Sequence, residues 1–240
     1  MLDEDKKQII MLSIVVLSII ALIIIVKNVD IGSRNKDRDV LTSPDLDFSS
    51  EKVLYYKNVK GYLAKPKNQG RYPGIIMIHE WWGLNENTKS MAEKLASRGY
   101  IVLAVDLFNG KIAQTEEEAG KLVSSMNNEE SMNNLKSALV YLKTHEAVDK
   151  IGALGWGFGG GESLRLSLSS NLDATVIYYG DIITNKENLS SIQSPILGIF
   201  TSEETPITIS AIKEFDSSLE ELGVDKEIYI YDNPKGTFEK

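Results

Sequence analysis

The chain of 240 residues contains no cysteine and only two histidines, His79 and His145. The missing thiol excludes disulfides, thiolate-bound zinc, iron–sulfur clusters and a cysteine nucleophile. Two histidines that stand far apart, without cysteine, do not form a ligand cluster, so we predict no metal site and no other cofactor. Any imidazole chemistry must use one of the two. His145 stands at the end of a predicted helix and is expected at the surface.

A dominant basic face is also missing. The chain has 26 Lys and Arg against 34 Asp and Glu, which gives a net charge of -8. A protein whose main task is to hold nucleic-acid phosphates carries the opposite balance, so no nucleic-acid partner is expected. The remaining composition, 42% hydrophobic and 25% charged, is typical of one globular domain with an appendage. Small molecules or other proteins are the favoured partners.

One long hydrophobic run is present, from Ile9 to Val26, and it contains no charged residue. As a helix, this segment (Ile9-Val26) would rise about 27 Å, close to the roughly 30 Å hydrocarbon core of a bilayer. Bulky residues continue up to Lys27, so the small residues of a signal-peptide cleavage site are missing. We therefore predict a polar tail (1–8), an uncleaved transmembrane anchor (9–27), a polar linker (28–50) and a folded domain (51–240).

The orientation of this anchor depends on flanking charges, which point both ways. Lys6 and Lys7 favour a cytoplasmic N-terminus by the positive-inside rule, whereas four basic residues after the run favour the reverse: Lys27, Arg34, Lys36 and Arg38. The very short tail favours the N-terminus inside. The folded domain is therefore expected on the extracytoplasmic side of the membrane.

Beyond the linker, short β-rich segments alternate with helical periodicity, which is typical of an α/β fold with a mostly parallel sheet and helices on both faces. The predicted strands are Val53–Tyr56, Val59–Lys65, Gly74–His79, Ile101–Asp106, Lys150–Trp156, Ala174–Tyr179, Ile196–Thr201 and Lys226–Tyr231. The predicted helices are Asn85–Arg98, Thr115–Met126, Glu129–Thr144, Gly160–Ser169 and Thr208–Leu222. In such a sheet the binding crevice lies at the carboxyl ends of the strands.

Three segments resemble the dienelactone hydrolase family of α/β-hydrolases. They read YPGIIMIHEWWGLNENTKSMAEKLASRGYIVLAVDLFNGK (Tyr72–Lys111), GALGWGFGGGESL (Gly152–Leu164) and SPILGIF (Ser194–Phe200). The resemblance runs from about residue 52 to the C-terminus. It implies an α/β-hydrolase fold that acts on ester or lactone bonds, with a nucleophile at a tight turn, an acid after a later strand and a His after the last strand.

The sequence departs from this family at the nucleophile. Gly157 stands where the family carries Cys or Ser. Glycine adopts the strained backbone of this turn at little cost, so the turn can persist without its chemistry. Ser163 is a poor substitute, because it lies inside the predicted helix, two turns from the tip of the elbow, which gives it the wrong reach and direction.

The resemblance places the acid at Glu204 and the base at Gly236. Glu is an accepted orienting acid in the superfamily, although Glu204 can also be read as a solvated loop charge. Gly236 offers no group that could take a proton. The chain ends at Lys240, before the family's closing helix, which we therefore expect to be absent.

The first crevice segment keeps the family pattern. Glu80 matches the family's glutamate beside the nucleophile, and the backbone N–H groups of Trp81 and Phe158 match its oxyanion-hole donors, which need no particular side chain. For His79 we favour structural hydrogen bonds over the alternative of a catalytic role. Trp81 and Trp82 either line the pocket or pack against the sheet.

Three functions remain open at this point. The first is a hydrolase relative that has lost its triad and binds a small molecule or a protein. The second is an active ester or lactone hydrolase in which Glu80 serves as a general base on water. The third is dinucleotide binding, because Gly155-x-Gly157-x-x-Gly160 followed by Asp181 also matches the spacing of that fingerprint.

Overall fold

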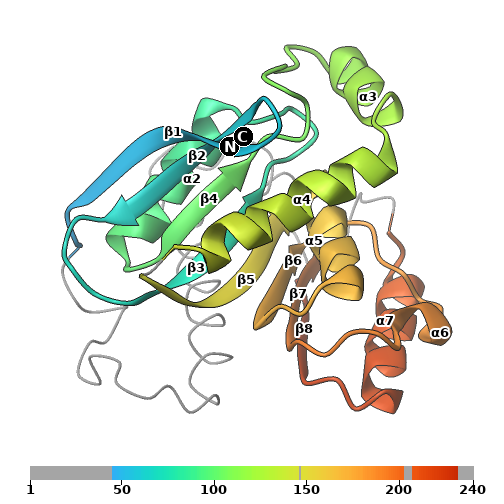
Figure 1. The fold of residues 1–240 in the computed structure, drawn as a ribbon. Helices are drawn as coiled ribbons and strands as arrows, with labels where there is room; N and C mark the ends of the chain where they lie inside the picture. The colour runs from blue at the N-terminus through green and yellow to red at the C-terminus, as the bar shows by residue number, and fades with distance from the viewer. Residues whose placement is uncertain (1–44, 146, 203–206, 232–240) are drawn as a thin grey trace, which may run out of the picture.

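The computed structural model describes residues 45–145, 147–202 and 207–231. Through this part runs one eight-stranded sheet with the order β1-β2-β4-β3-β5-β6-β7-β8 (Figure 1). Its strands are β1 (Phe48–Tyr56), β2 (Val59–Pro66), β3 (Tyr72–Ile78), β4 (Ile101–Val105), β5 (Val148–Trp156), β6 (Ala174–Tyr178), β7 (Ile196–Thr201) and β8 (Lys226–Tyr231). The helices are α2 (Glu86–Ser97), α3 (Glu116–Ser124), α4 (Asn128–Lys143), α5 (Phe158–Ser169), α6 (Lys186–Leu189) and α7 (Ile209–Glu221).

The sheet is mostly parallel, as predicted. β1 pairs with β2 and β2 with β4 in antiparallel fashion, whereas the five remaining pairs, β4–β3, β3–β5, β5–β6, β6–β7 and β7–β8, are parallel. The central strands are continuous apolar runs, because helices cover both of their faces: every residue of β4, β6 and β7 is buried. All parallel strands end at the same edge, so this edge can hold a site.

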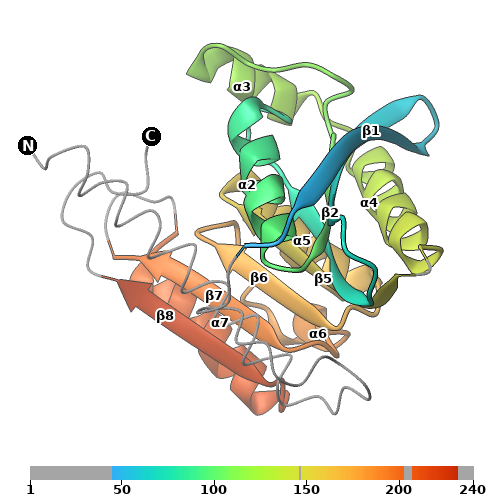
Figure 2. The same ribbon diagram turned by 90° about the vertical axis from the view of Figure 1, so that its left-hand side faces the viewer.

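The helices divide between the two faces. α2 packs its buried Ala92, Leu95 and Ala96 against one face of the central strands. On the other face, α4 contributes Leu135 and Leu139 to a second core. α5 lies on the same side as α4, and α7 covers the β7–β8 end of that side. Figure 2 shows α2 and α4 on opposite sides of the strands between them. Helices on both faces were predicted and are confirmed.

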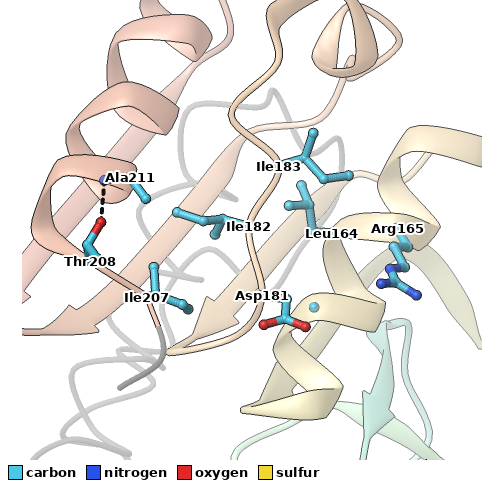
Figure 3. Close-up of a pocket in the computed structure, with 9 residues that line it drawn as sticks. Leu164, Arg165, Asp181, Ile182, Ile183, Ile207, Thr208 and Ala211 are labelled. Carbon is cyan, nitrogen blue, oxygen red and sulfur yellow. Dashed lines mark hydrogen bonds between the residues drawn. The ribbon is translucent and has the colours of Figure 1, made fainter. Parts of the chain in front are cut away.

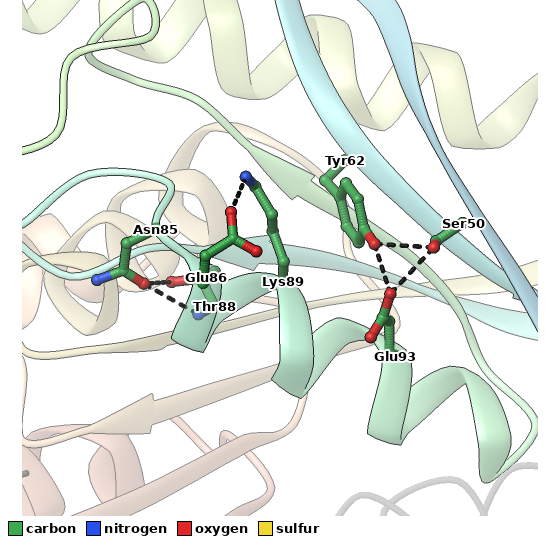
Figure 4. Close-up of polar contacts among 7 residues, drawn as sticks. All are labelled: Ser50, Tyr62, Asn85, Glu86, Thr88, Lys89 and Glu93. Atoms are coloured by element: carbon green, nitrogen blue, oxygen red, sulfur yellow. Dashed lines mark hydrogen bonds and ion pairs between the residues drawn. The ribbon is translucent and has the colours of Figure 1, made fainter.

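α2 is fixed at its start and along its exposed side by polar contacts. The Asn85 side chain accepts a hydrogen bond from the Thr88 N–H at 3.1 Å, which begins the helix. Further along, Glu93 accepts hydrogen bonds from the Tyr62 hydroxyl at 2.5 Å and from Ser50 Oγ at 3.0 Å (Figure 4). These contacts tie α2 to the antiparallel pair β1–β2.

Three local predictions need correction. β1 begins at Phe48, inside the predicted linker 28–50, because an edge strand with exposed polar residues shows little hydrophobic alternation. α5 begins at Phe158 instead of Gly160, since its three consecutive glycines hide the helical pattern. His145 is half-buried and its Nδ1 is fully covered, so it is not the surface residue that its place after a helix predicts.

The predicted transmembrane anchor 9–27 lies outside the described residues. Within the residues that are described, no helix is both long and apolar enough to cross a bilayer. Most of the predicted linker and the residues that follow β8 also lie outside the described part.

Candidate active site

Gly157 occupies the sharp turn between β5 and α5 that the sequence predicts. Its φ of 51° is positive and its ψ is -117°, a backbone conformation that glycine adopts at least cost. The turn is held by a hydrogen bond of 2.9 Å from the Gly157 N–H to the Tyr178 carbonyl. A Cβ at this position would lie 3.6 Å from Tyr179 Cε2 and 3.9 Å from Glu80 Oε1, both ordinary contacts. The position therefore has room for a side chain that would point toward Glu80.

The neighbouring glycines have no such room. A Cβ on Gly155 would lie 2.2 Å from the Gly159 carbonyl, and one on Gly159 would lie 2.3 Å from the Ile78 carbonyl oxygen. A Cβ on Gly160 would lie 2.9 Å from the Tyr178 carbonyl oxygen. These glycines let α5 approach β3 and β6 closely. Close packing therefore accounts for the glycine spacing without a bound dinucleotide.

His79 lies at the end of β3 and is fully buried. Its Nδ1 lies 2.6 Å from the Glu80 carbonyl oxygen, and its Nε2 accepts a hydrogen bond of 3.1 Å from the Leu107 N–H. Burial lowers the pKa of the imidazole, so the ring is neutral at neutral pH. The predicted hydrogen bonds of His79 are present.

Three rings join the loops that leave β3, β4 and β5. The His79 centroid lies 4.8 Å from that of Phe108 and 6.1 Å from that of Phe158, while the two Phe rings are 5.5 Å apart. Buried Asp106 holds the middle loop, because its Oδ1 accepts a hydrogen bond from the Phe108 N–H at 2.9 Å. The loops that follow β3, β4 and β5 are therefore packed against one another through these rings.

Glu80 lies beside the elbow and is half-buried. The Tyr179 hydroxyl donates a hydrogen bond to Glu80 Oε1 at 3.3 Å. Tyr179 has a positive φ of 37°, which directs the chain away from β6 immediately after the strand. We did not predict Tyr179 as a site residue. The available signal was its position at the carboxyl end of a buried strand, directly before Gly180.

The two predicted oxyanion donors belong to two different segments, the start of α5 and the loop after β3. Phe158 is the first residue of α5, so its N–H has no acceptor within the helix. Trp81 is the second residue of a tight turn closed by a hydrogen bond of 3.1 Å from the Gly83 N–H to the Glu80 carbonyl. Trp81 and Trp82 are both half-buried, with centroids 5.2 Å apart. They serve partly as packing and partly as surface next to the site.

The other predicted residues have different outcomes. Ser163 is fully buried and donates a hydrogen bond of 2.9 Å to the Gly159 carbonyl, so it is not available as a nucleophile. Glu204 and Gly236, the predicted acid and base positions, lie outside the described residues and stay predictions. Among the residues that the structure describes, no group of three or more His, Asp or Glu could hold a metal ion.

A cavity of about 400 Å³ lies farther along α5, and none of the predicted hydrolase-site residues lines it, although Asp181 of the alternative dinucleotide fingerprint does. Aliphatic and polar side chains both line it, and they come from α5, the segment after β6 and the start of α7; Figure 3 shows Asp181 and Arg165 near one side. Arg165 Nη1 lies 3.2 Å from Oε1 of Glu162, whose exposed fraction is only 4%. Burial raises the pKa of Glu162 and Arg165 partly offsets this shift.

The geometry can be compared with known proteins. The model of the dienelactone hydrolase family matches residues 59–240. "Protein usf" of Aquifex pyrophilus is 30% identical over 192 residues, which cover 75% of this chain and 82% of that protein. A "Carboxymethylenebutenolidase homolog" of Xenopus tropicalis is 27% identical over 188 residues, 75% of each chain.

A solved structure supports the same fold. The dienelactone hydrolase-like promiscuous phosphotriesterase P91, from metagenomic libraries, superposes with a TM-score of 0.71 at 22% identity, covering 78% of this chain and 82% of that one. The fold, the elbow between β5 and α5 and the family match over residues 59–240 agree. The chain belongs to the dienelactone hydrolase family.

Proposed function

We propose that this chain binds small carboxylic esters or lactones, with the carbonyl oxygen held by the N–H groups of Trp81 and Phe158, and that no covalent acyl intermediate forms at position 157. The observation that carries the proposal is Gly157 itself. It keeps the backbone conformation of a nucleophile elbow, with room for a side chain toward Glu80, yet it carries no oxygen or sulfur.

The two halves of the site have different chemical requirements. Covalent hydrolysis needs an attacking atom at the elbow and a base within hydrogen-bond reach of its proton. Position 157 has no attacking atom, and Gly236, at the family's His position, supplies no base. Carbonyl binding needs only backbone N–H groups in fixed directions, and these do not depend on the missing side chains. Binding therefore survives where covalent turnover does not.

A second candidate function is hydrolysis by direct attack of water. It is favoured by the position of Glu80 Oε1, 3.9 Å from where a Gly157 Cβ would lie. Glu80 would take a proton while the water oxygen bonds to the carbonyl carbon. The carbon–oxygen bond to the leaving group would then break, and Glu80 would return the proton to the departing alkoxide. Oxyanion stabilisation and binding alone leave an acceleration on the order of 10³ over water.

We also propose that the protein is a single-pass membrane protein with its folded domain on the extracytoplasmic side. The support is the uncharged run 9–26 in the sequence and the short tail before it. Protease added to intact cells is expected to digest the folded domain. Protection in intact cells, followed by digestion after lysis, would contradict the orientation. Release of the chain by a carbonate wash of membranes would contradict the anchor.

The test of the principal proposal uses the full chain and p-nitrophenyl butyrate, a short-chain aryl ester. We expect the native chain to give no turnover, and the Gly157→Ser/Gly236→His double variant to gain turnover in the preformed oxyanion site. The matched control is Gly157→Ala/Gly236→His, which adds the same Cβ but no nucleophile and should stay inactive. Clear turnover by the native chain would overturn the binding-only proposal and favour attack by water.

A further inference from the structure

We propose that His79 is a positioning residue that fixes the direction of the Trp81 N–H and so presets one of the two oxyanion donors. The consequence for ligand binding rests on the proposed function, whereas the geometric claim stands on its own. The proposal starts from one observation: both ring nitrogens of a fully buried histidine contact backbone groups of two crevice loops.

These two contacts determine which nitrogen of the ring carries the proton. The Glu80 carbonyl can only accept a hydrogen bond, so His79 Nδ1, 2.6 Å away, must donate. The Leu107 N–H can only donate, so His79 Nε2, 3.1 Å away, must accept. A neutral imidazole has one donor and one acceptor nitrogen. The surroundings therefore select the tautomer with the proton on Nδ1.

The hydrogen bond to Glu80 acts on Trp81 through the peptide group between them. A peptide group is planar, and in its trans form the C=O and N–H bonds point in opposite directions. The described residues contain no cis peptide bond. By holding the Glu80 carbonyl, His79 therefore turns the Trp81 N–H the other way. The Gly83 N–H bonds the same carbonyl at 3.1 Å and closes the turn. Together the two donors leave the peptide plane little freedom to rotate.

The same imidazole also contacts Phe158, whose N–H is the second proposed oxyanion donor. Its ring lies against the ring of Phe158, with centroids 6.1 Å apart and planes inclined by 25°. At the next residue, a Cβ on Gly159 would lie 2.6 Å from the His79 carbonyl oxygen, so the start of α5 sits directly on the end of β3. His79 thus contacts the segments that carry both N–H groups, and its ring fixes their relative positions.

Two substitutions of similar size separate positioning from simple core filling. In His79→Asn, the side-chain amide stands where Nδ1 stood and can still donate to Glu80. In His79→Gln, the side chain has a carbon at that place, while its amide oxygen can still accept from Leu107. Phe108→Leu removes a ring contact but keeps both hydrogen bonds of the imidazole. The proposal predicts loss of positioning only for His79→Gln.

The direct measurement is the orientation of the Trp81 N–H vector, read from residual dipolar couplings of the isotopically labelled full chain in detergent micelles. We expect the native chain, His79→Asn and Phe108→Leu to agree, and His79→Gln to differ at Trp81. An unchanged vector in His79→Gln would overturn the proposal. Equal changes in the Asn and Gln variants would also overturn it, because they would show a purely structural role.

A measurement on the native chain covers the case in which the variants fail to fold. The measurement is the nitrogen NMR spectrum of the labelled histidine rings. The chain has two histidines, so the signals of the His79 ring are assigned by comparison with His145→Gln. The proposal requires the proton to be on Nδ1. A proton on Nε2 would overturn the proposal, because the ring would then have no hydrogen to donate to Glu80.

The effect on binding is measured with butyrate, the acid that a butyrate ester would release. In the native chain we expect the Trp81 and Phe158 amide resonances to shift as butyrate is added. In His79→Gln we expect about tenfold weaker binding, because one charge-assisted hydrogen bond is misdirected. If butyrate does not bind the native chain while the Trp81 vector still turns in His79→Gln, the proposed function fails and the positioning role stands.

Discussion

The Tyr179 hydroxyl donates a hydrogen bond to Glu80 Oε1 at 3.3 Å and so links the end of β6 to the loop after β3. The contact passes beside Gly157, where an added Cβ would touch both side chains at ordinary distances. A polar pair therefore faces the space that a nucleophile would occupy. Under the proposed function, this pair lines the space beside position 157 without an attacking group.

The first prediction concerns any ester hydrolysis that the native chain performs. If water attacks with Glu80 as the base, Glu80→Gln should lower the rate by at least about 100-fold, because general-base catalysis contributes that much. Tyr179→Phe keeps the carboxylate and loses one hydrogen bond to it, so we expect a smaller loss of about tenfold. The measurement is the initial rate with p-nitrophenyl butyrate. A full rate in Glu80→Gln would show that Glu80 takes no part.

The second prediction compares two glycines that stand two residues apart. Gly157→Ala has room for its Cβ but keeps a left-handed φ of 51°, so we expect a loss of about 1–3 kcal/mol in the free energy of unfolding. Gly159→Ala would place its Cβ 2.3 Å from the Ile78 carbonyl oxygen, and α5 would have to move. It should be clearly more destabilising. Urea unfolding of both variants checks the order, and equal losses would contradict it.

Much of this fold can be predicted from the sequence, because buried strands have a recognisable composition. The run from Gly74 to Ile78 is apolar throughout because helices cover both faces of β3, and such runs are easy to recognise. β1 was harder to predict: Ser49 to Lys52 lie on an edge strand and alternate only weakly. The hydrophobic pattern of a sequence therefore identifies a strand that is buried on both faces more easily than an edge strand that is partly buried on one face.

The site shows a similar division. Gly157, Glu80, Trp81 and Phe158 were identified through resemblance in chain segments that are contiguous and specific. Tyr179 was missed because its contact with Glu80 spans 99 positions of the chain, and no local pattern encodes it. The direction of the Tyr179 side chain depends on a positive φ, and a tyrosine in a sequence gives no reason to expect one.

The third prediction concerns a buried polar network beside the crevice. The Asp106 N–H donates to the Tyr55 hydroxyl at 3.1 Å, and that hydroxyl also bonds the Asn134 side chain. Tyr55→Phe would remove both hydrogen bonds to this hydroxyl, although the Asn134 amide keeps its bond to the Asp106 carbonyl, at a cost of about 1–3 kcal/mol. Tyr72→Phe is the matched control, since its hydroxyl makes an exposed hydrogen bond to the Asn68 carbonyl. Thermal and urea unfolding should show a clear loss for Tyr55→Phe alone; equal stability of both variants would contradict the role of the network.

The last prediction concerns how stability depends on pH at Glu162. Burial raises the pKa of this carboxyl above its ordinary value of 4.5, so the folded state binds the proton more tightly than the unfolded state does. Its contribution therefore makes the free energy of unfolding fall as pH rises from about 4.5 through the raised pKa. Glu162→Gln removes this contribution, so the variant should gain stability relative to the native chain as pH rises from about 4.5 through the raised pKa.

Glu130 supplies a control of opposite sign. The ammonium group of Lys57 lowers the pKa of this exposed carboxyl, so the stability that it contributes is present above its ordinary pKa and is lost as pH falls through the lowered value. Glu130→Gln should therefore lose a little stability relative to the native chain as pH rises, within the small range of an exposed ion pair. Urea unfolding at several pH values gives both differences. The same sign of pH dependence for the two variants would show that burial does not govern the titration of Glu162.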